Sequence, residues 1–284
     1  RLIDAFQPDL VHSYGWYTYS VAAALGGRQV PLLISARDYA YGCAARTLVQ
    51  RGQRPCSGPA PLKCLGCAAD LYGAVGVALG RRLLARKVSG VHSISTYVQE
   101  MVHRDAFPVG EQTRTSALRG RGEQTRTSAV RGGREQTRTS AVRGGRELIE
   151  AVIPSFREND QAVTYGDDPA LQPYLAQLPD QPFILFVGAL RRVKGVEQLL
   201  AAYQTLPDPP PLVLIGTYES DSPRSFPPGV HVLTELPHRA VMAAWERALF
   251  GVIPSLWPEP LGSVVYEGLS RGRALIGTTP AGHT

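Results

Sequence analysis

The sequence has no run of about eighteen apolar residues, the length that a membrane-spanning helix requires. It also has little lysine: arginine carries nearly all of the positive charge, and lysine stands only at positions 63, 87 and 194. The first residues, Arg1 to Asp9, resemble a helix leading into a strand rather than a signal peptide, and no initiator Met precedes them. We therefore expect a cytoplasmic protein, and we expect an N-terminal part of it to be missing from this sequence.

The formal net charge of +6 comes from one segment. Residues 111–146 are three tandem units of period twelve, beginning at Glu111, Glu123 and Glu135, and each unit contains three Arg and one Glu. The remaining chain is therefore neutral, so we expect no specific nucleic-acid partner, although an Arg- and Gly-rich tract can bind RNA without folding. Each unit offers only Ala and a single Val or Leu to a core. We expect a disordered insertion whose deletion leaves the fold intact.

The length of 284 residues and the hydrophobic fraction of 44% allow two domains with substantial cores. Apolar strand-like segments alternate with helical stretches, which is typical of a doubly wound parallel sheet. The pattern predicts strands at 10–13, 31–35, 90–94, 183–187, 212–215, 230–233, 251–254 and 274–277. It predicts helices at 16–25, 71–86 and 195–205 and a further helix that begins near residue 262.

Two carboxylates lie eight residues apart near the C-terminus, across a loop that opens a helix of small residues. Glu259 follows an apolar strand, and Glu267 falls two turns into the helix, so that both can face one ligand. The backbone amides at the helix start favour an anion such as a diphosphate. Taken alone, the spacing is also typical of a helix-dipole acid beside a solvated one.

A second segment also combines a buried-type strand, a turn and a helix start. The strand 183–187 leads into Gly188-Ala-Leu-Arg-Arg-Val-Lys-Gly195. Lys194 is the candidate ligand here, because an ammonium group is a compact phosphate partner. In this order along the chain, the two segments predict one anion-binding site.

Together these segments resemble the donor-phosphate loop and the Glu-x7-Glu motif of retaining glycosyltransferases of family 4. The resemblance implies an α/β fold of the GT-B type, with two Rossmann-like doubly wound domains facing a cleft, and relative to the family both domains are incomplete. It implies an acceptor-side domain at residues 1–155, a linker at 156–180 and a domain that binds the nucleotide-sugar donor at 181–284.

The resemblance also implies roles for single residues. Glu259 is expected to contact the transferred sugar, Glu267 the donor ribose and Lys194 the diphosphate, beside the amides of Leu261 and Gly262. Retaining enzymes of this family rely on donor phosphate and acceptor positioning, so binding geometry and charge stabilisation are expected to do most of the chemistry.

Two positions depart from the family pattern. Ala189 stands where the family has Arg, so Arg191 or Arg192 has to substitute from a shifted position. Arg37 stands where the family has an acceptor-side His, while Asp38 retains the acid of that motif and can orient an acceptor hydroxyl. A solvated or Arg-paired Asp is the commoner role for such a residue. The secondary candidates are two histidines, at positions 12 and 283.

The four cysteines lie in one short region rich in Pro, Gly and Arg: Cys43, Cys56, Cys64 and Cys67. The last two form a Cys-x2-Cys pair, and four thiols in a cytosolic chain can close a tetrahedral zinc site or, less commonly, hold an iron–sulfur cluster. Free thiols and a disulfide pair are the alternatives. Some bacterial members of the resembled family carry a similar stretch, which implies no established metal.

We therefore expect a retaining hexosyl-type glycosyltransferase that moves a sugar from a UDP-, GDP- or ADP-sugar to a glycan, lipid-linked or small-molecule acceptor. The alternatives are a non-catalytic relic or sugar-nucleotide-binding fragment and, more weakly, a sugar-nucleotide epimerase. No Asp-x-Asp-like pair stands in a suitable loop, because Asp167-Asp168 falls in the linker, so donor binding is expected to need no divalent metal. Peripheral association with the inner face of the membrane stays open.

Overall fold

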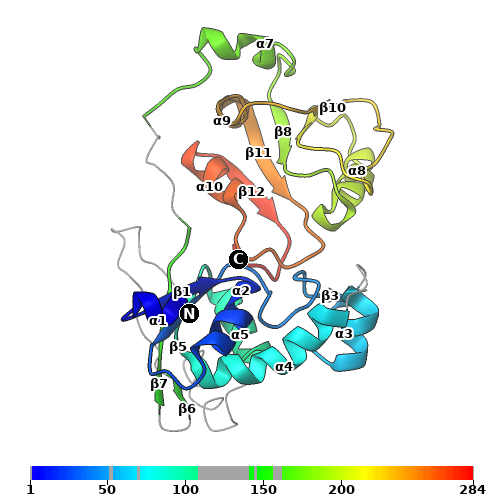
Figure 1. The fold of residues 1–284 in the computed structure, drawn as a ribbon. Helices are drawn as coiled ribbons and strands as arrows, with labels where there is room; N and C mark the ends of the chain where they lie inside the picture. The colour runs from blue at the N-terminus through cyan, green and yellow to red at the C-terminus, as the bar shows by residue number, and fades with distance from the viewer. Residues whose placement is uncertain are drawn as a thin grey trace, which may run out of the picture. The chain divides into compact units, whose positions relative to one another are not determined.

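The computed structural model describes residues 2–50, 54–68, 71–107, 141–143, 146–155 and 162–283. The chain divides into two compact units, Arg1–Pro154 and Ser155–Thr284. Each unit is built around its own five-stranded sheet with helices packed against it (Figure 1). None of the described helices is both long enough and apolar enough to cross a bilayer.

The sheet of the first unit has the strand order β1-β2-β5-β7-β6. Its strands are β1 (Val11–Tyr14), β2 (Leu32–Ala36), β5 (Val88–Ser93), β6 (Ala141–Arg143) and β7 (Arg146–Val152). The first-unit helices are α1 (Leu2–Phe6), α2 (Tyr17–Leu25), α3 (Pro61–Ala68), α4 (Leu71–Lys87) and α5 (Thr96–Asp105), and a small hairpin joins β3 (Val49–Gln50) to β4 (Arg54–Pro55). Strands β1, β2, β5 and β7 are parallel, as the alternation of strands and helices predicts.

The repeat segment contributes one strand to this sheet. Strand β6 lies at the end of the third repeat unit and pairs with β7 in antiparallel fashion. The last repeat residues therefore take part in the sheet instead of lying in an insertion without structure. Most of the predicted disordered insertion, residues 111–140 and 144–145, lies outside the described residues.

The second unit is a parallel sheet of order β10-β9-β8-β11-β12. The strands are β8 (Phe183–Val187), β9 (Leu212–Ile215), β10 (Val230–Leu233), β11 (Ala248–Ile253) and β12 (Ala274–Gly277). Four of them have the predicted bounds, and β11 begins and ends earlier than the predicted strand 251–254. The helical segments are η2 (Pro169–Leu171), α7 (Gln172–Leu175), η3 (Arg192–Lys194), α8 (Val196–Gln204), α9 (His238–Arg247) and α10 (Ser263–Ser270).

Two hydrophobic cores lie on opposite faces of this sheet, because alternate residues of β8 point to opposite sides. Phe183 and Leu185 pack in one core with Trp245 of α9, whose side chain is fully buried. Ile184 and Phe186 pack in the other core against α8. The predicted apolar face of α8 is buried there through Val196, Leu199, Leu200 and Tyr203.

Part of the segment expected to be a linker belongs to the core that contains Trp245. Segments η2 and α7 carry Leu171 and Leu175 into it, and Leu178 follows directly. Glu246 of α9 also accepts hydrogen bonds from the backbone amide of Tyr165, at 3.0 and 3.2 Å. Residues 165–178 therefore fold as part of the second unit, although the sequence predicted a linker there.

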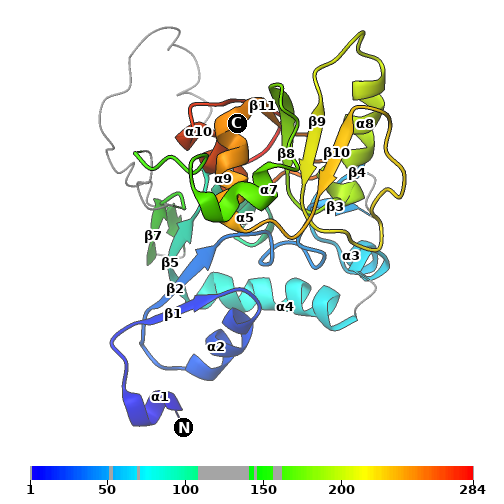
Figure 2. The same cartoon turned by 90° about the horizontal axis from the view of Figure 1, so that it is seen from above.

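The strand order of the second sheet reverses between β8 and β11. Figure 2 shows β9 and β10 on one side of β8 and β11 on its other side. Strand β12 pairs with β11 beyond it. In an open parallel α/β sheet, ligands bind outside the carboxyl ends of the strands at such a reversal, because the two connecting loops diverge to opposite faces there. The ends of β8 and β11 are thus the expected place for a ligand.

Candidate functional site

Two loops meet at the carboxyl ends of β8 and β11. The Leu256 amide donates to the Val193 carbonyl oxygen at 2.9 Å. Gly195 has a φ of +74°, and a Cβ atom at this position would lie 1.8 Å from the carbonyl oxygen of Pro254. Only glycine allows both this backbone conformation and this close approach. The loop after β8 therefore packs directly against the end of β11.

Lys194 and Glu259 form an ion pair between these two loops. The Lys194 Nζ atom lies 2.8 Å from Glu259 Oε1, and the side chains are 27% and 8% exposed. The Ser255 hydroxyl donates a hydrogen bond to the same carboxylate oxygen. The Nζ atom also lies 5.5 Å from the centroid of the Trp257 ring, within the range of a cation–π contact. The positive charge is thus held in place at the strand reversal.

The backbone around Glu259 is fastened by the loop that follows β12. The Gly282 amide donates to the Glu259 carbonyl oxygen at 2.7 Å, and the Thr278 hydroxyl donates to the Ser255 carbonyl oxygen at 2.6 Å. His283 belongs to this loop, and its ring lies against Gly277, where an added Cβ would be 2.8 Å from His283 Nε2. Three loops of the second unit therefore define the position of Glu259.

The second acid of the pair lies on the helix that follows. Glu267 is in α10 with a side chain that is 7% exposed, and its Oε1 atom lies 3.3 Å from Nε2 of His238, the first residue of α9. Gly262 is the N-cap of α10, no side chain caps the helix start, and a Cβ at Gly262 would lie 3.0 Å from Glu259 Oε2. One loop and helix thus carry both carboxylates and the uncapped helix start.

The two arginines proposed as substitutes for the family's Arg have acidic partners of their own. Arg191 Nε lies 3.2 Å from Asp221 Oδ1, and Arg192 Nε lies 3.1 Å from Glu197 Oε2. Both arginine side chains are largely exposed, at 48% and 66%. Of the three basic residues in the loop, Lys194 is the one that the structure brings to Glu259.

Asp38 of the first unit is engaged within its own loop. Its Oδ1 atom accepts a hydrogen bond from the Ala40 amide at 2.9 Å, and its Oδ2 atom lies 3.8 Å from Arg46. This arrangement is the Arg-paired alternative that the sequence left open. It supports the loop after β2, and a role in orienting an acceptor stays a prediction.

His12 takes part in a polar chain across three strands. Its Nε2 atom lies 2.8 Å from the Ser35 hydroxyl, which lies 3.0 Å from His92 Nδ1. The buried Tyr41 hydroxyl donates to the Ser35 carbonyl oxygen at 3.1 Å, and burial raises the pKa of Tyr41 to about 12. Tyr41 is therefore a neutral structural donor at ordinary pH.

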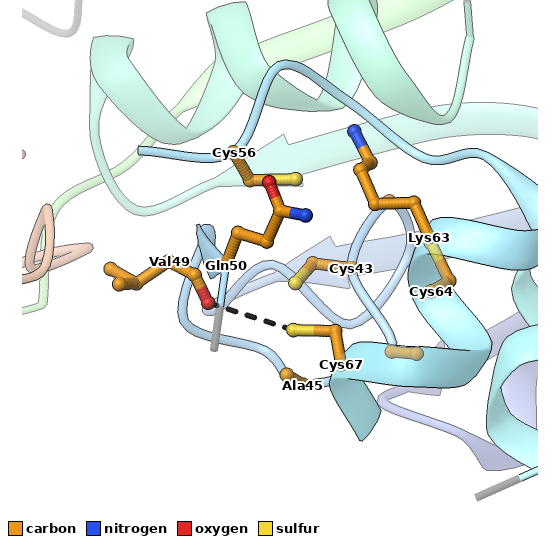
Figure 3. Close-up of a pocket in the computed structure, with 10 residues that line it drawn as sticks. Cys43, Ala45, Val49, Gln50, Cys56, Lys63, Cys64 and Cys67 are labelled. Carbon is orange, nitrogen blue, oxygen red and sulfur yellow. Dashed lines mark hydrogen bonds between the residues drawn. The ribbon is translucent and has the colours of Figure 1, made fainter. Parts of the chain in front are cut away.

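The four cysteines line one pocket in the first unit together with Val49, Gln50 and Lys63 (Figure 3). All four are free thiols. Cys67 Sγ donates to the Val49 carbonyl oxygen at 3.7 Å, Cys56 Sγ donates to the Gly58 carbonyl oxygen at 3.5 Å, and burial raises the pKa of the Cys43 thiol.

Within the part of the chain that the structure describes, no three or more Cys, His, Asp or Glu side chains are placed to hold a metal ion. The zinc site predicted at Cys43, Cys56, Cys64 and Cys67 is therefore not borne out, and neither is the iron–sulfur alternative. Cys56 and Cys67 instead lie within hydrogen-bond distance of the backbone carbonyl oxygens of Gly58 and Val49. The structure has the free-thiol alternative.

The strand reversal at β8 and β11 lies in a segment that matches the model of a known family. Residues 172–284 match the family model described as glycosyl transferases group 1. The matched segment contains Lys194 and Glu259, which form the ion pair at the strand reversal, and Glu267 of α10. No curated protein sequence matches the chain.

Several solved structures have a similar fold. The OtsA apo structure is 13% identical with a TM-score of 0.59, and the match covers 99% of this chain and 61% of OtsA. HepE of Anabaena in complex with UDP is 16% identical with a TM-score of 0.57, over 98% of this chain and 62% of HepE. The UDP-forming α,α-trehalose-phosphate synthase of Burkholderia xenovorans, in complex with glucose-6-phosphate, is 11% identical with a TM-score of 0.58, over 99% and 62%.

At these identities the likeness shows the fold, and it confirms the predicted α/β class with parallel sheets of the GT-B type. The chain spans about three fifths of the length of these structures. Three side chains at the site were not predicted: Ser255, Trp257 and His238. None of them belongs to a spacing pattern. Only the folded chain places Ser255 beside Glu259, Trp257 beside Lys194 and His238 beside Glu267.

Proposed function

We propose that this chain binds a nucleotide sugar at the ends of β8 and β11 and transfers the sugar to an acceptor. The observation that carries the proposal is the ion pair between Lys194 and Glu259 at the strand reversal, inside the segment that matches the glycosyl transferase model. The Lys194 ammonium group and the uncapped start of α10 favour an anion. The buried carboxylates of Glu259 and Glu267 can accept hydrogen bonds from hydroxyl groups.

Each group has a role in this proposal. The Lys194 ammonium has three N–H donors, so that it can bind a diphosphate while it contacts Glu259. The amides of Leu261 and Gly262 supply further donors as negative charge develops on the departing nucleotide diphosphate. Glu259 faces the transferred sugar and Glu267 faces the ribose. Retention of configuration and membership of family 4 are part of the proposal, because the sequence motifs resemble that family.

The solved structures suggest which ligands to test first. HepE was solved with UDP and with UDP-glucose, and the trehalose-phosphate synthase with glucose-6-phosphate. A UDP-sugar is therefore the first donor to test, ahead of GDP- and ADP-sugars. The acceptor is a glycan, a lipid-linked sugar or a small molecule such as a sugar phosphate. A cytoplasmic location, with peripheral association at a membrane left open, stays a prediction.

A thermal-shift panel of UDP-, GDP- and ADP-sugars tests the donor site. A ligand at a hundred times its dissociation constant should stabilise the protein by about 2.7 kcal/mol. We expect a shift with one nucleotide class, and a smaller shift for Glu267→Ala at the same ligand concentration. Glu100→Ala, which removes an exposed acid of α5 in the first unit, is the matched control and should keep the full shift. The absence of a shift with every donor would refute the proposal.

Chelation tests the expected independence from divalent metal. Lys194 and the helix start supply the positive charge that the diphosphate needs, and no Asp-x-Asp-like pair stands at the strand reversal. We expect the dissociation constant of the donor, measured by titration calorimetry, to change by less than about twofold in excess EDTA. Loss of donor binding on chelation, with recovery on adding Mg²⁺ or Mn²⁺, would contradict this expectation.

A second candidate function is nucleotide-sugar binding without transfer. Two observations favour it: Arg191 and Arg192 are already paired with Asp221 and Glu197, and Asp38 is engaged by its own loop. Donor binding without transfer to any acceptor and without donor hydrolysis would support this candidate. Formation of an epimer in the absence of an acceptor would instead indicate a sugar-nucleotide epimerase.

A further inference from the structure

We propose that His238 is a positioning residue for recognition of the donor ribose, and that it acts by holding the carboxylate of Glu267. This inference rests on the proposed function, because it assigns a role within the same donor site. It goes further by naming a residue in a segment, Leu236 to Arg239, that carries none of the motif residues.

The contact itself is the first step of the argument. Glu267 is almost completely buried, and a buried carboxylate is costly unless a donor reaches it. His238 Nε2 lies 3.3 Å from Oε1, while the imidazole is 53% exposed. The histidine therefore approaches the buried acid from the solvent side, which is the side from which a ligand has to enter.

The position of His238 is set by the start of α9. Pro237 is the N-cap of this helix, and its carbonyl oxygen accepts the Ala240 amide at 2.8 Å. The buried residues of α9 run from Ala240 to Trp245 without interruption, so the helix cannot slide or rotate without disturbing a core. The imidazole is thus presented from a rigid element and not from a free loop.

Helix α10 is packed closely on α9, which sets the distance between the two side chains. A Cβ atom at Gly268, the residue after Glu267, would lie 3.1 Å from Cζ3 of Trp245. Glycine at this point lets the backbone of α10 approach the indole of α9. This contact fixes both helices relative to each other. The distance between His238 and Glu267 is therefore set by the packing of the second unit.

The strand topology places His238 and Glu267 at the end of the sheet where the carboxyl ends of the parallel strands lie. Helix α9 follows β10, and α10 follows β11, and these strands are parallel to β8 within one sheet. The starts of both helices therefore lie at the same sheet edge as Lys194. A carboxylate has about four acceptor sites on its two oxygens. A hydrogen bond to one oxygen restricts rotation of the carboxylate, and so restricts the directions from which its oxygens can accept hydrogen bonds from the ribose hydroxyls.

Ribose discrimination tests this role directly. Titration calorimetry would measure the affinities of UDP and 2′,3′-dideoxy-UDP for the whole chain and for three variants. The wild type should prefer UDP by about tenfold or more. His238→Ala should lose most of that preference through weaker UDP binding, with dideoxy-UDP nearly unchanged. His238→Gln should recover part of it, because an amide N–H can replace the imidazole N–H.

His231→Ala is the matched control, since His231 is an exposed histidine of β10 in the same unit, and it should keep the wild-type preference. Thermal unfolding of each variant shows whether it is folded, and His238→Gln carries the test if the alanine variant is not. Wild-type discrimination that persists in folded His238 variants would overturn this inference and leave the donor site standing. A wild type that binds no nucleotide would overturn both.

Discussion

Replacing Glu259 by Gln should lower the kcat/KM of sugar transfer by roughly 10²–10³-fold while the protein stays folded. The carboxylate is buried beside the Lys194 ammonium, and a preformed charge in such a site acts where charge develops in the transition state. The amide keeps an oxygen that can accept from Lys194 and Ser255, so the loops should hold their positions. Steady-state transfer with the donor that the thermal-shift panel selects is the measurement.

Binding of the nucleotide alone separates the sugar contact from the diphosphate contact. If Glu259 faces the transferred sugar, UDP should bind the Glu259→Gln variant within about threefold of its affinity for the wild type. Glu197→Gln removes an exposed acid that pairs with Arg192 in the same unit, and we expect it to transfer at a rate close to wild type. A Glu259→Gln variant with the full transfer rate would refute the role assigned to this residue.

Replacing Gly195 by Ala should destabilise the second unit by about 3 kcal/mol or more and abolish most donor binding. A methyl group there would lie 1.8 Å from the Pro254 carbonyl oxygen, and the φ of +74° is unfavourable for alanine. The loop after β8 has to leave the end of β11, which breaks the hydrogen bond between Val193 and Leu256 and separates Lys194 from Glu259. Urea unfolding and a donor titration measure the two effects.

The chain supplies a control that separates backbone strain from the steric clash. Gly272 also has a left-handed backbone, with a φ of +68°, but a Cβ there would meet nothing within 4 Å. Gly272→Ala should therefore lose only about 1 kcal/mol of unfolding free energy, from the unfavourable backbone conformation, and should keep its donor binding. Equal losses of stability in the two variants would show that the contact between Gly195 and Pro254 does not hold the loops together.

Secondary structure in the second unit followed from local pattern. Strands such as β8 and β9 are short, continuous apolar runs between turn residues, and a parallel strand buried on both faces produces this pattern. The helical period also predicted α8 correctly. Helix α7 (Gln172–Leu175) was not predicted, because four residues are too few to show a helical hydrophobic period. Its position is determined by the packing of Leu171 and Leu175 in the core.

The candidate site was predicted in part. Lys194 and Glu259 were singled out from motif spacing, and the structure joins them at 2.8 Å. Arg191 and Arg192 were singled out by charge and by the resemblance. Their acidic partners come from the loop after β9 and from α8, and no local sequence pattern predicts these ion pairs. The zinc site was predicted from Cys-x2-Cys spacing, which does not determine whether four thiols converge on one point, and the described residues show the free-thiol alternative.

The sequence by itself determined the α/β class, the bounds of four of the five strands in the second unit and the identity of the charged residues in the two motifs. These properties depend on neighbouring residues, since hydrophobic periodicity and turn chemistry act over a few positions. The tertiary structure alone decided the strand order that reverses at β8 and β11, the close packing of Gly195 against Pro254 and the contact between His238 and Glu267. Each of these contacts joins residues that are far apart in the chain, and their positions follow from how the whole sheet and its helices pack.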